Sequence, residues 1–397
     1  MTTTTARFLI VGGGLEGLAI AWSLADQGET DVVVVERDTL CSGMTGKSSG
    51  VVRCHYGHPS LAAMSWYGVD IFTRATEIFG DDMAFQQCGY VVGVGENNIQ
   101  PLRATVSMMQ NLGIDVEFIG NDKMAELWPG LHLDDFAAFA YEPLGGRGEA
   151  YMAGMAFAAS ARKLGVKIRQ STPVTQLLQD DSGRVYGAEL GNGDAIHADT
   201  VIVAAGPWTP ALTEGVGAPV DVRAQRAQLV LVDQGAPTPV VPVLSDLAGL
   251  SYICREPNGE LLVGNSDHSS PQYIDPDNYV NRADEGTIDK IIMKLGHRLP
   301  DMPDPRITSS YVGAYDVTPD YNPIIGPAPV DGLFLATGFS GHGFKISPAV
   351  GKLAADLLLT GTTTLKHVEP SDFRYSRFAE NDLLLSLHPY EGAGEMR

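Results

Sequence analysis

The chain has 397 residues, of which 44% are hydrophobic and 19% are charged. This composition is that of a folded globular protein, and a length well above ~250 residues predicts two lobes rather than one core. The formal net charge of −21 disfavours nucleic acid and anionic membranes as partners. It also means that an anionic substrate needs a local cationic site.

Cysteine spacing and the lack of long apolar runs narrow the class of protein further. Cys41, Cys54, Cys88 and Cys254 form no CxxC pair and no metal-ligand spacing, so we expect reduced thiols and no metal site. No signal-peptide pattern opens the sequence, and no apolar run approaches the ~20 residues of a membrane span. We therefore expect a cytoplasmic protein without a membrane span.

The first elements form one strand–turn–helix–strand unit. Phe8–Val11 and Val32–Val35 are short apolar runs typical of buried parallel strands. Between them, residues 15–27 carry apolar residues at helical spacing, and Gly28 follows as a helix stop. The Thr2–Thr5 run before this unit is expected to be a frayed terminus.

The rest of the chain predicts two interleaved lobes. Helices are expected at residues 61–79, 102–112, 152–165, 287–295 and 347–359, strands at 166–168, 185–190, 200–204 and 333–336, and a strand-rich stretch at 220–311. Cofactor-like features fall into three separated blocks. We therefore expect cofactor-domain parts at residues 1–85, 147–219 and 320–397, the last with a C-terminal tail, and substrate-domain parts at 86–146 and 220–319.

The turn after the first strand carries a nucleotide-binding motif. Its sequence, GGGLEG at residues 12–17, satisfies G-x-G-x-x-G. Gly12 allows the tight turn, Gly14 lets a pyrophosphate approach the backbone, and Gly17 permits helix-to-strand contact. The helix that starts at Leu15 offers N–H groups and a positive dipole end to the phosphates.

Glu36 supports a dinucleotide site, and two later segments decide between NAD and FAD. Glu36 ends the second strand, where a carboxylate accepts hydrogen bonds from ribose hydroxyls. Val201–Trp208 is a late strand that ends in glycine, and Gly338–Lys345 is a glycine-rich loop that enters another helix. A second helix start suits a flavin ring, which gains negative charge at N1 and O2 on reduction. These segments favour FAD, and an NAD-only dehydrogenase stays open as an alternative.

Four segments carry a family resemblance that spans nearly the whole chain: Gly12–Gly17 with Glu36, Ala204–Trp208, Thr318–Gly326 and Gly338–Pro348. They resemble the D-amino-acid oxidase superfamily of FAD-dependent oxidoreductases, within it the sarcosine oxidase and glycine oxidase branch. The resemblance implies an α/β (α+β) fold, with a Rossmann-like FAD-binding domain and a second substrate domain built on a large mixed β-sheet.

The resemblance also implies site residues. In that branch an arginine and the lysine of the C-terminal glycine loop hold the substrate carboxylate, and these match Arg53 and Lys345. Two cations from distant positions would form an anion trap in an acidic protein. A backbone contact to adenine matches Val174. The expected FAD contacts are Gly12, Gly14, Leu15, Gly17, Glu36, Arg37, Ser48, Ser49, Val174, Ala205, Gly206, Trp208, Gly338, Gly341, His342, Gly343, Phe344 and Lys345.

Three departures from the family pattern matter for the chemistry. Gly313 stands where monomeric sarcosine oxidase has its flavin-linked cysteine, so we expect FAD to be bound non-covalently. Leu262 stands at the place of the oxygen-activating lysine, so oxidase and dehydrogenase both remain open. Tyr151 lies near the flavin-linked histidine of the multi-subunit enzymes, and a covalent FMN is not expected.

The combined features predict FAD-dependent oxidation of the C–N bond of a small amino acid or N-alkyl amino acid, by hydride transfer to flavin N5. Tyr56, Tyr252, Tyr315 and His342 are expected in the pocket wall. The electron acceptor is oxygen or a carrier, and a homo-oligomer is left open. Two alternatives are a 2-hydroxy-acid dehydrogenase, with His268 or His342 as base, and an FAD-binding subunit of a larger amine-oxidising complex.

Overall fold

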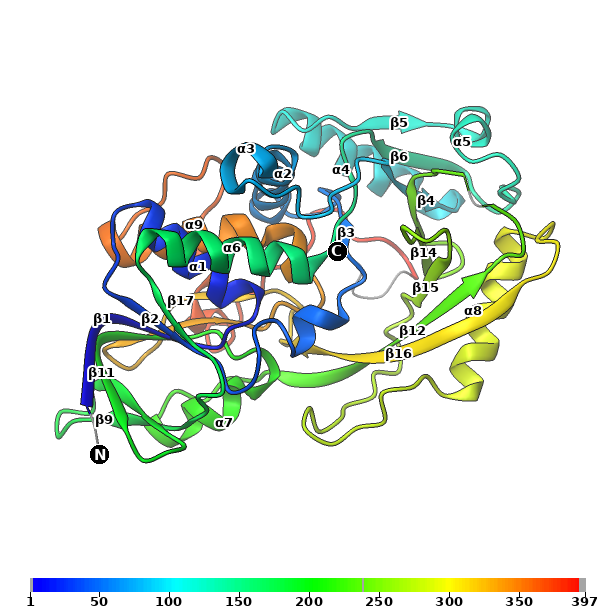
Figure 1. Ribbon diagram of the computed structural model, residues 1–397. Coiled ribbons are helices and arrows are strands. Elements are labelled where there is room, and N and C mark those ends of the chain that lie inside the picture. Colours follow the sequence, from blue (N-terminus) through cyan, green and yellow to red (C-terminus); the bar gives the residue numbers. More distant parts are fainter. Residues whose placement is uncertain (1–2, 238, 393–397) are drawn as a thin grey trace.

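An eight-stranded mixed sheet forms one lobe of the protein, at the left of Figure 1. The structure, a computed structural model, describes residues 3–237 and 239–392. The strand order is β17-β18-β11-β1-β2-β8, and β10 pairs with both β11 and β9. The strands are β1 (Thr3–Val11), β2 (Val32–Val35), β8 (Lys167–Arg169), β9 (Val174–Gln179), β10 (Val185–Leu190), β11 (Ala195–Val203), β17 (Ile324–Pro327) and β18 (Leu333–Thr337).

Parallel pairing explains the composition of this sheet. β18, β11, β1, β2 and β8 pair in parallel, and Val32–Val35 is buried along its whole length. Parallel strands are covered on both faces, which favours continuous apolar runs. On one face lie the helices α1 (Leu15–Asp26), α6 (Ala150–Leu164) and α9 (Gly343–Thr360), and α1 packs against both of the others (Figure 1).

A second eight-stranded sheet forms the other lobe. Its order is β16-β12-β15-β14-β13-β4-β6-β5, antiparallel except where β13 meets β4. The strands are β4 (Tyr90–Val94), β5 (Glu117–Ile119), β6 (Ala138–Glu142), β12 (Arg223–Asp233), β13 (Val243–Asp246), β14 (Ser251–Arg255), β15 (Leu261–Asn265) and β16 (Arg306–Val317). The helices of this lobe are α4 (Ile99–Asn111), α5 (Asn121–Leu127) and α8 (Glu285–Arg298). The predicted fold class is confirmed.

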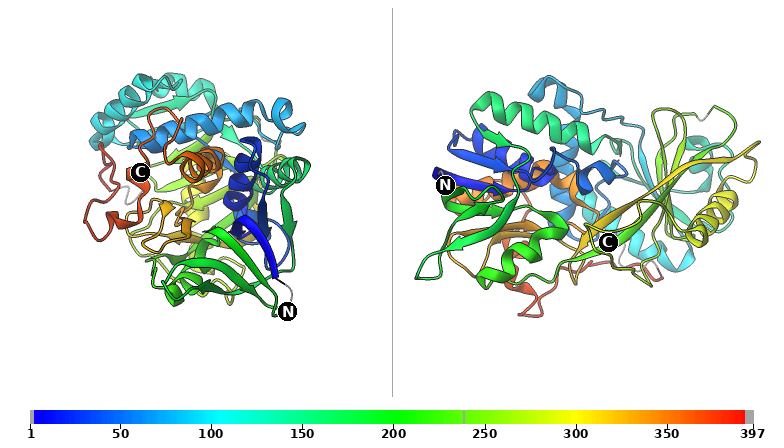
Figure 2. Two further views of the ribbon diagram at one scale, coloured as in Figure 1. Left: turned by 90° about the vertical axis from the view of Figure 1, so that its left-hand side faces the viewer. Right: turned by 60° about the horizontal axis from the view of Figure 1, so that its bottom comes forward.

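The two lobes lie side by side, and β12 and β16 run as long strands from one toward the other (Figures 1 and 2). The two-stranded sheet of β3 (Val51–Val52) and β7 (Gly146–Arg147) is separate from both large sheets. The predicted domain boundaries are compatible with this strand distribution and stay a prediction. None of the described helices is long and apolar enough to cross a bilayer.

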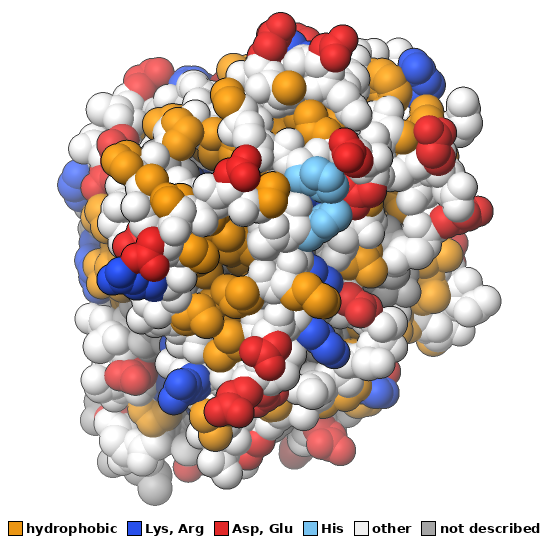
Figure 3. All heavy atoms as spheres, turned by 90° about the vertical axis from the view of Figure 1, so that its right-hand side faces the viewer, with side chains coloured by type: hydrophobic (Ala, Val, Ile, Leu, Met, Phe, Trp, Pro, Cys, Tyr) orange, Lys and Arg blue, Asp and Glu red, His pale blue; other side chains and the backbone are white. Residues whose placement is uncertain are grey.

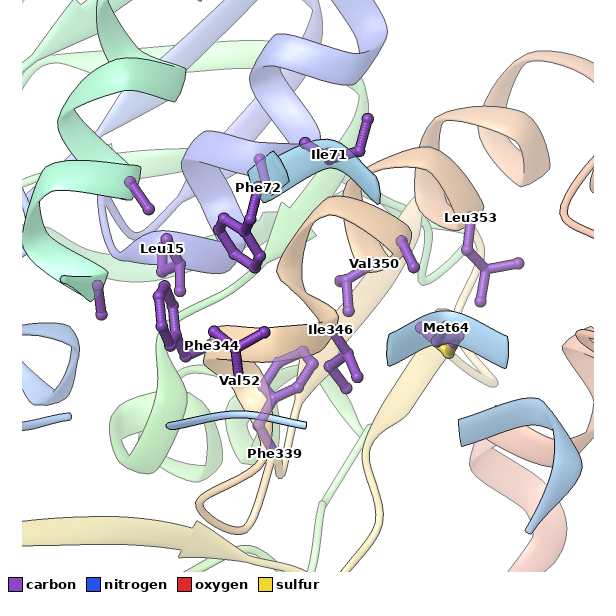
Figure 4. Packing of buried hydrophobic residues seen from close by; sticks show 14 of the residues in the cluster. Leu15, Val52, Met64, Ile71, Phe72, Phe339, Phe344, Ile346, Val350 and Leu353 are labelled. Carbon is purple, nitrogen blue, oxygen red and sulfur yellow. The ribbon is translucent and has the colours of Figure 1, made fainter. Parts of the chain in front are cut away.

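The first core packs at the meeting of three helices. Figure 4 shows Leu15 of α1, Phe72 of α2 (Pro59–Thr73), and Ile346 and Val350 of α9 in this core. Burying each such side chain stabilises the fold by about 1.5–3 kcal/mol. The core therefore fixes the start of α9 relative to the start of α1.

Two element predictions were wrong in detail, and one strand was missed. The helix expected at residues 61–79 is divided at Arg74 into α2 and α3 (Ala75–Phe79), because the backbone there leaves helical geometry at φ −98° and ψ 13°. Thr3–Thr5 is not frayed, because these residues pair in parallel with Ala195–His197 of β11. The strand β9 was not predicted.

The glycine-rich loop is also shorter than predicted, because α9 already begins at Gly343. The sequence predicted a start at Ser347, one residue before Pro348. Pro348 lies inside the helix, where it cannot donate to the carbonyl oxygen of Phe344 four residues earlier. The Ser347 hydroxyl donates to that oxygen instead, at 2.9 Å. This substitute bond lets the helix include Lys345 in its first turn.

Candidate active site

A cavity of about 480 Å³ lies at the carboxyl ends of β1, β2 and β11, where α1 and α9 begin. The carboxyl edge of an open α/β sheet is where nucleotides bind. Many of the predicted cofactor contacts line its wall: Gly12, Gly14, Leu15, Glu36, Arg37, Ser48, Ser49, Val174, Ala205, Gly206, Trp208, Gly341, Gly343 and Phe344. Within the described residues, Gly17, Gly338, His342 and Lys345 are not part of that wall.

The glycine turn is closed by backbone contacts. Gly12 has φ +116°, and a Cβ there would lie 2.3 Å from the carbonyl oxygen of Ala204. A Cβ on Gly17 would lie 2.1 Å from the carbonyl oxygen of Gly12. Gly14 lines the cavity, and a Cβ there would come no nearer than 3.4 Å to Thr45. The first and third glycines are therefore needed for packing, and the second leaves the wall open to a ligand.

Glu36 and Arg37 are held in place at the end of β2. Glu36 accepts hydrogen bonds from the backbone N–H of Gly13 at 2.8 Å and of Asp38 at 2.9 Å. The Arg37 guanidinium lies 4.0 Å from the ring centroid of Trp208, and it pairs with Asp277 at 2.8 Å. A fixed carboxylate at this edge suits a ribose, and the flat Arg37–Trp208 pair suits an adenine-sized ring.

Several residues of this wall were missed by sequence reasoning. Thr45 accepts a hydrogen bond from the N–H of Leu15 at 3.0 Å, so it caps α1. Asp316 accepts from the N–H groups of Gly338 at 2.8 Å and Phe339 at 3.1 Å. Glu16 is within the glycine motif, but at one of its variable positions. No spacing rule marks any of these three residues, and only the fold brings them to the cavity.

The cavity fits FAD. It is bounded by the first turn of α1 at one place and by the first turn of α9 at another, so two helix N-termini face one ligand. Gly12 and Gly341 are part of its wall, and each has a positive φ and a neighbour that a Cβ would meet at under 3.0 Å. These residues would hold the nucleotide at the β1–β2 edge and leave the α9 end for the ring.

Arg53, Tyr56, His342 and Lys345 form a second, buried cluster, which we call the cation cluster. The Arg53 guanidinium carbon is 4.3 Å from the ring centroid of Tyr56, and Lys345 Nζ is 5.7 Å from the same centroid. The His342 ring centroid is 5.3 Å from that of Tyr56. All four side chains are buried. The fold thus brings the two predicted carboxylate-binding cations to one aromatic ring.

The cation cluster is electrostatically strained without an anion. Burial, and then the neighbouring Arg53 charge, lower the pKa of Lys345 well below its usual range. A carboxylate between the two cations would favour the ammonium form of Lys345. Nearby, burial raises the pKa of Glu142 to about 7, against the opposing hydrogen bond from the Cys54 N–H. Glu142 was not predicted, because no motif surrounds it.

Tyr252 belongs neither to the cation cluster nor to the lining of the cavity, but it contacts residues of that lining. It is on β14 and makes hydrogen bonds with Ser49 and Tyr315, both of which line the cavity. Gly264 allows this position, because a Cβ there would lie 2.1 Å from the Tyr252 ring. The sequence prediction placed Tyr56 and Tyr252 in one pocket wall, and the structure places them in adjoining regions.

Histidine side chains also gather on the outer face of the second lobe (Figure 3). His132, Asp135 and His297 bring ligand atoms within 4.8 Å of one another. Both oxygens of Asp135 already accept hydrogen bonds from Arg298. A guanidinium in that position opposes a metal cation, so this cluster is an ion-pair network that ties α8 to the loop before β6.

The fold and the cavity together define the class of a two-lobed dinucleotide-binding protein. The family comparison specifies it further: the chain belongs to the FAD dependent oxidoreductase family, whose model matches residues 7–357. The predicted resemblance and FAD, rather than NAD alone, as the cofactor are thereby confirmed.

Curated relatives are similar over nearly the whole chain. The chain is 28% identical to 4-methylaminobutanoate oxidase (formaldehyde-forming) of Paenarthrobacter nicotinovorans, over 99% of this chain and 48% of that protein. It is 28% identical to mitochondrial dimethylglycine dehydrogenase of Mus musculus, over 94% of this chain and 44% of that protein. Sarcosine oxidase subunit beta of Arthrobacter sp is 25% identical, over 95% and 92% of the two chains. The chain thus spans about half the length of the first two relatives.

Solved structures share the fold. L-proline dehydrogenase from P. horikoshii superposes with a TM-score of 0.87 at 23% identity, covering 96% of this chain and 100% of that one. Glycine oxidase from Geobacillus kaustophilus gives a TM-score of 0.81 at 24% identity, covering 94% and 99%.

Proposed function

We propose that this protein oxidises the C–N bond of a small amino acid or N-alkyl amino acid, with the substrate carboxylate held between Arg53 and Lys345. The observation that carries the proposal is the cation cluster, which joins two buried cations to the start of α9, where that helix meets the cofactor cavity. Relatives named for 4-methylaminobutanoate, dimethylglycine and sarcosine support an amine substrate that bears a carboxylate.

The cofactor and the protein side chains have separate roles in the proposed reaction. Bound FAD supplies a hydride acceptor for the carbon next to nitrogen, and the imine that results hydrolyses in water. Arg53 and Lys345 hold the carboxylate beside the Tyr56 ring, and all three side chains are buried. The proposed cofactor contacts are the predicted residues that line the cavity. FAD is proposed to be non-covalent, because Gly313 offers no side chain for attachment.

Anaerobic mixing tests the substrate class. The purified yellow protein is combined with N-methylglycine, proline, D-amino acids, 4-methylaminobutanoate and 2-hydroxy acids, and the flavin absorbance is followed. Bleaching by an amine and not by its hydroxy analogue is expected. Bleaching only by a hydroxy acid would establish the 2-hydroxy-acid dehydrogenase instead, with His342 beside Tyr56 as the candidate base.

Arg53→Met tests the carboxylate role. Removing one partner of a buried charge contact costs ~2–5 kcal/mol, which corresponds to a rise in apparent KM of about thirtyfold or more. The matched control is Arg103→Met, since Arg103 also lies over an aromatic ring, 3.8 Å from the Phe118 centroid, but on α4 of the second lobe. Equal KM values for wild type and Arg53→Met would reject the clamp.

Two further properties are proposed, one from the residue at position 262 and one from the comparisons. The electron acceptor is proposed to be a carrier rather than oxygen, because buried Leu262 stands where the family has its oxygen-activating lysine. Slow hydrogen peroxide formation in air, with rapid turnover on an artificial dye, is the expected pattern. The similarity to sarcosine oxidase subunit beta favours a second candidate, an FAD-binding subunit of a larger complex. A chain that binds FAD yet is not reduced by any amine until a partner is added would establish it.

A further inference from the structure

Glu16 is an unusual residue at the wall of the cofactor cavity. It is the second residue of α1, inside the glycine turn expected to hold the cofactor phosphates. An ionised carboxylate there would repel the pyrophosphate of a dinucleotide. The position therefore needs a carboxyl group that is neutral or turned elsewhere.

The side chain of Glu16 is turned toward the start of α9. Its Oε1 lies 2.5 Å from the point that a Cβ on Gly343 would occupy. Its Oε2 is buried and has no hydrogen-bond partner among the described residues. A buried polar atom without a partner costs about 1–3 kcal/mol, so a native structure that keeps one commonly uses it for a ligand.

Its charged surroundings favour a proton on the carboxyl group. Burial, and then the negative charge of Asp316, raise the pKa of Glu16 well above its usual range. Asp316 at the end of β16 is itself buried enough that its pKa rises to about 6. The other charged residues on the cavity wall are Glu36, Arg37, Asp38 and Lys47.

A purely structural role would look different. An acidic residue in the first turn of a helix stabilises the helix dipole when it is ionised and exposed to water. Oε2 of Glu16 is shielded from water, and the first N–H of α1 is already capped by Thr45. The carboxyl group is thus better placed to act on a ligand than on its own helix.

We propose that Glu16 contacts the bound flavin at the α9 end of the cavity and takes up a proton when the flavin is reduced. Two electrons and one proton enter the flavin whether Glu16 is ionised or protonated. Where Glu16 is ionised in the oxidised protein, the added negative charge beside it draws a second proton from solvent onto its carboxylate. The inference uses FAD binding and does not depend on the amine substrate.

Potentiometry tests the proposal without any substrate. The midpoint potential of the bound flavin is measured against pH from 5 to 10 during chemical reduction with an indicator dye. In wild type, the slope above the ionisation of Glu16 should be twice as steep as the one-proton slope, because two protons accompany two electrons. Glu16→Gln keeps the size and the polarity of the side chain but cannot ionise. It should therefore show the one-proton slope throughout.

Asp38→Asn is the matched control, since Asp38 lines the same cavity but is exposed. It should keep the wild-type break in slope. A one-proton slope throughout in wild type would overturn the proposal, even if Glu16→Gln did not fold. A wild-type break that persists in Glu16→Gln would also overturn it. A flavin that reduces normally here but is never bleached by amines would reject the proposed substrate class and leave the role of Glu16 standing.

Discussion

At the scale of single residues, the carboxyl group of Glu142 controls the charge of the cation cluster. Its Oε2 accepts the N–H of Cys54 at 2.6 Å, and its Oε1 is buried without a hydrogen-bond partner among the described residues. Burial raises its pKa to about 7. Below that pH the group is neutral, and the Arg53 charge is fully available to a substrate carboxylate. Above it, the Glu142 carboxylate offsets that charge.

The apparent KM for a carboxylate substrate should therefore rise as pH increases through about 7. The sign follows from the raised pKa, because the form that binds an anion better is the protonated one. In Glu142→Gln the amide oxygen still accepts the Cys54 N–H, and the KM should be nearly independent of pH between 6 and 8. Initial-rate measurements across this range check it, and a variant that keeps the wild-type pH profile would exclude Glu142 as the cause.

Residue identities were predictable only where a motif or a family pattern marked them. Arg53 and Lys345 could be found because the resemblance covers both segments, and the structure brings them to one ring. Glu142 and Glu16 could not be found in this way, because nothing in the sequence distinguishes them from acidic residues that are exposed to solvent. Their burial depends on strands and helices far away in the sequence.

At the scale of elements, the crossing of α1 and α9 sets the distance between the two helix starts at the cavity. Gly351 lies in the middle of α9 against α1. A Cβ on Gly351 would lie 2.5 Å from the carbonyl oxygen of Ala19 and 2.6 Å from Ser23 Oγ. Because one of these atoms is backbone, the helices would have to move apart.

Gly351→Ala should lower the free energy of unfolding by about 1–3 kcal/mol through overpacking. It should also weaken FAD retention, since the two helix starts are displaced. Gly296→Ala is the matched control, because Gly296 is inside α8 with no atom within 4 Å of its added Cβ. That change should raise stability by about 0.5–1 kcal/mol. Denaturant unfolding of both variants measures these changes. If Gly351→Ala were as stable as wild type, the helix crossing would tolerate a methyl group.

Element predictions succeeded where the pattern was local. The strands at Phe8–Val11 and Val32–Val35 and the helix between them follow from short apolar runs and flanking glycines, and all three are present. The start of α9 was misplaced because its proline is accommodated by a hydroxyl bond that no propensity rule contains. β9 was missed because only one of its residues is buried and it lacks an apolar run.

At the scale of the whole molecule, the sequence predicted two lobes built from interleaved segments, because cofactor-like and sheet-rich stretches alternate along it. The structure has two eight-stranded sheets whose strands alternate in that way. The pairing order within the second sheet could not be predicted, since it depends on long-range contacts such as the parallel pair of β13 and β4.

The net charge of −21 gives a last prediction about the whole molecule. At low ionic strength its field repels an approaching anion, whereas the cation cluster attracts the anion only at short range. The Debye length falls from about 30 Å at 0.01 M salt to about 8 Å at 0.15 M, so added salt screens the long-range repulsion. The attraction inside the buried cation cluster is screened much less. Acetate binding, followed by its effect on the flavin spectrum, should therefore strengthen with salt over this range. N-methylglycine, a zwitterion without net charge, should show little change. If acetate binding weakens with salt instead, the cation cluster is open to solvent ions, and its two charges act as surface charges rather than as an enclosed anion site.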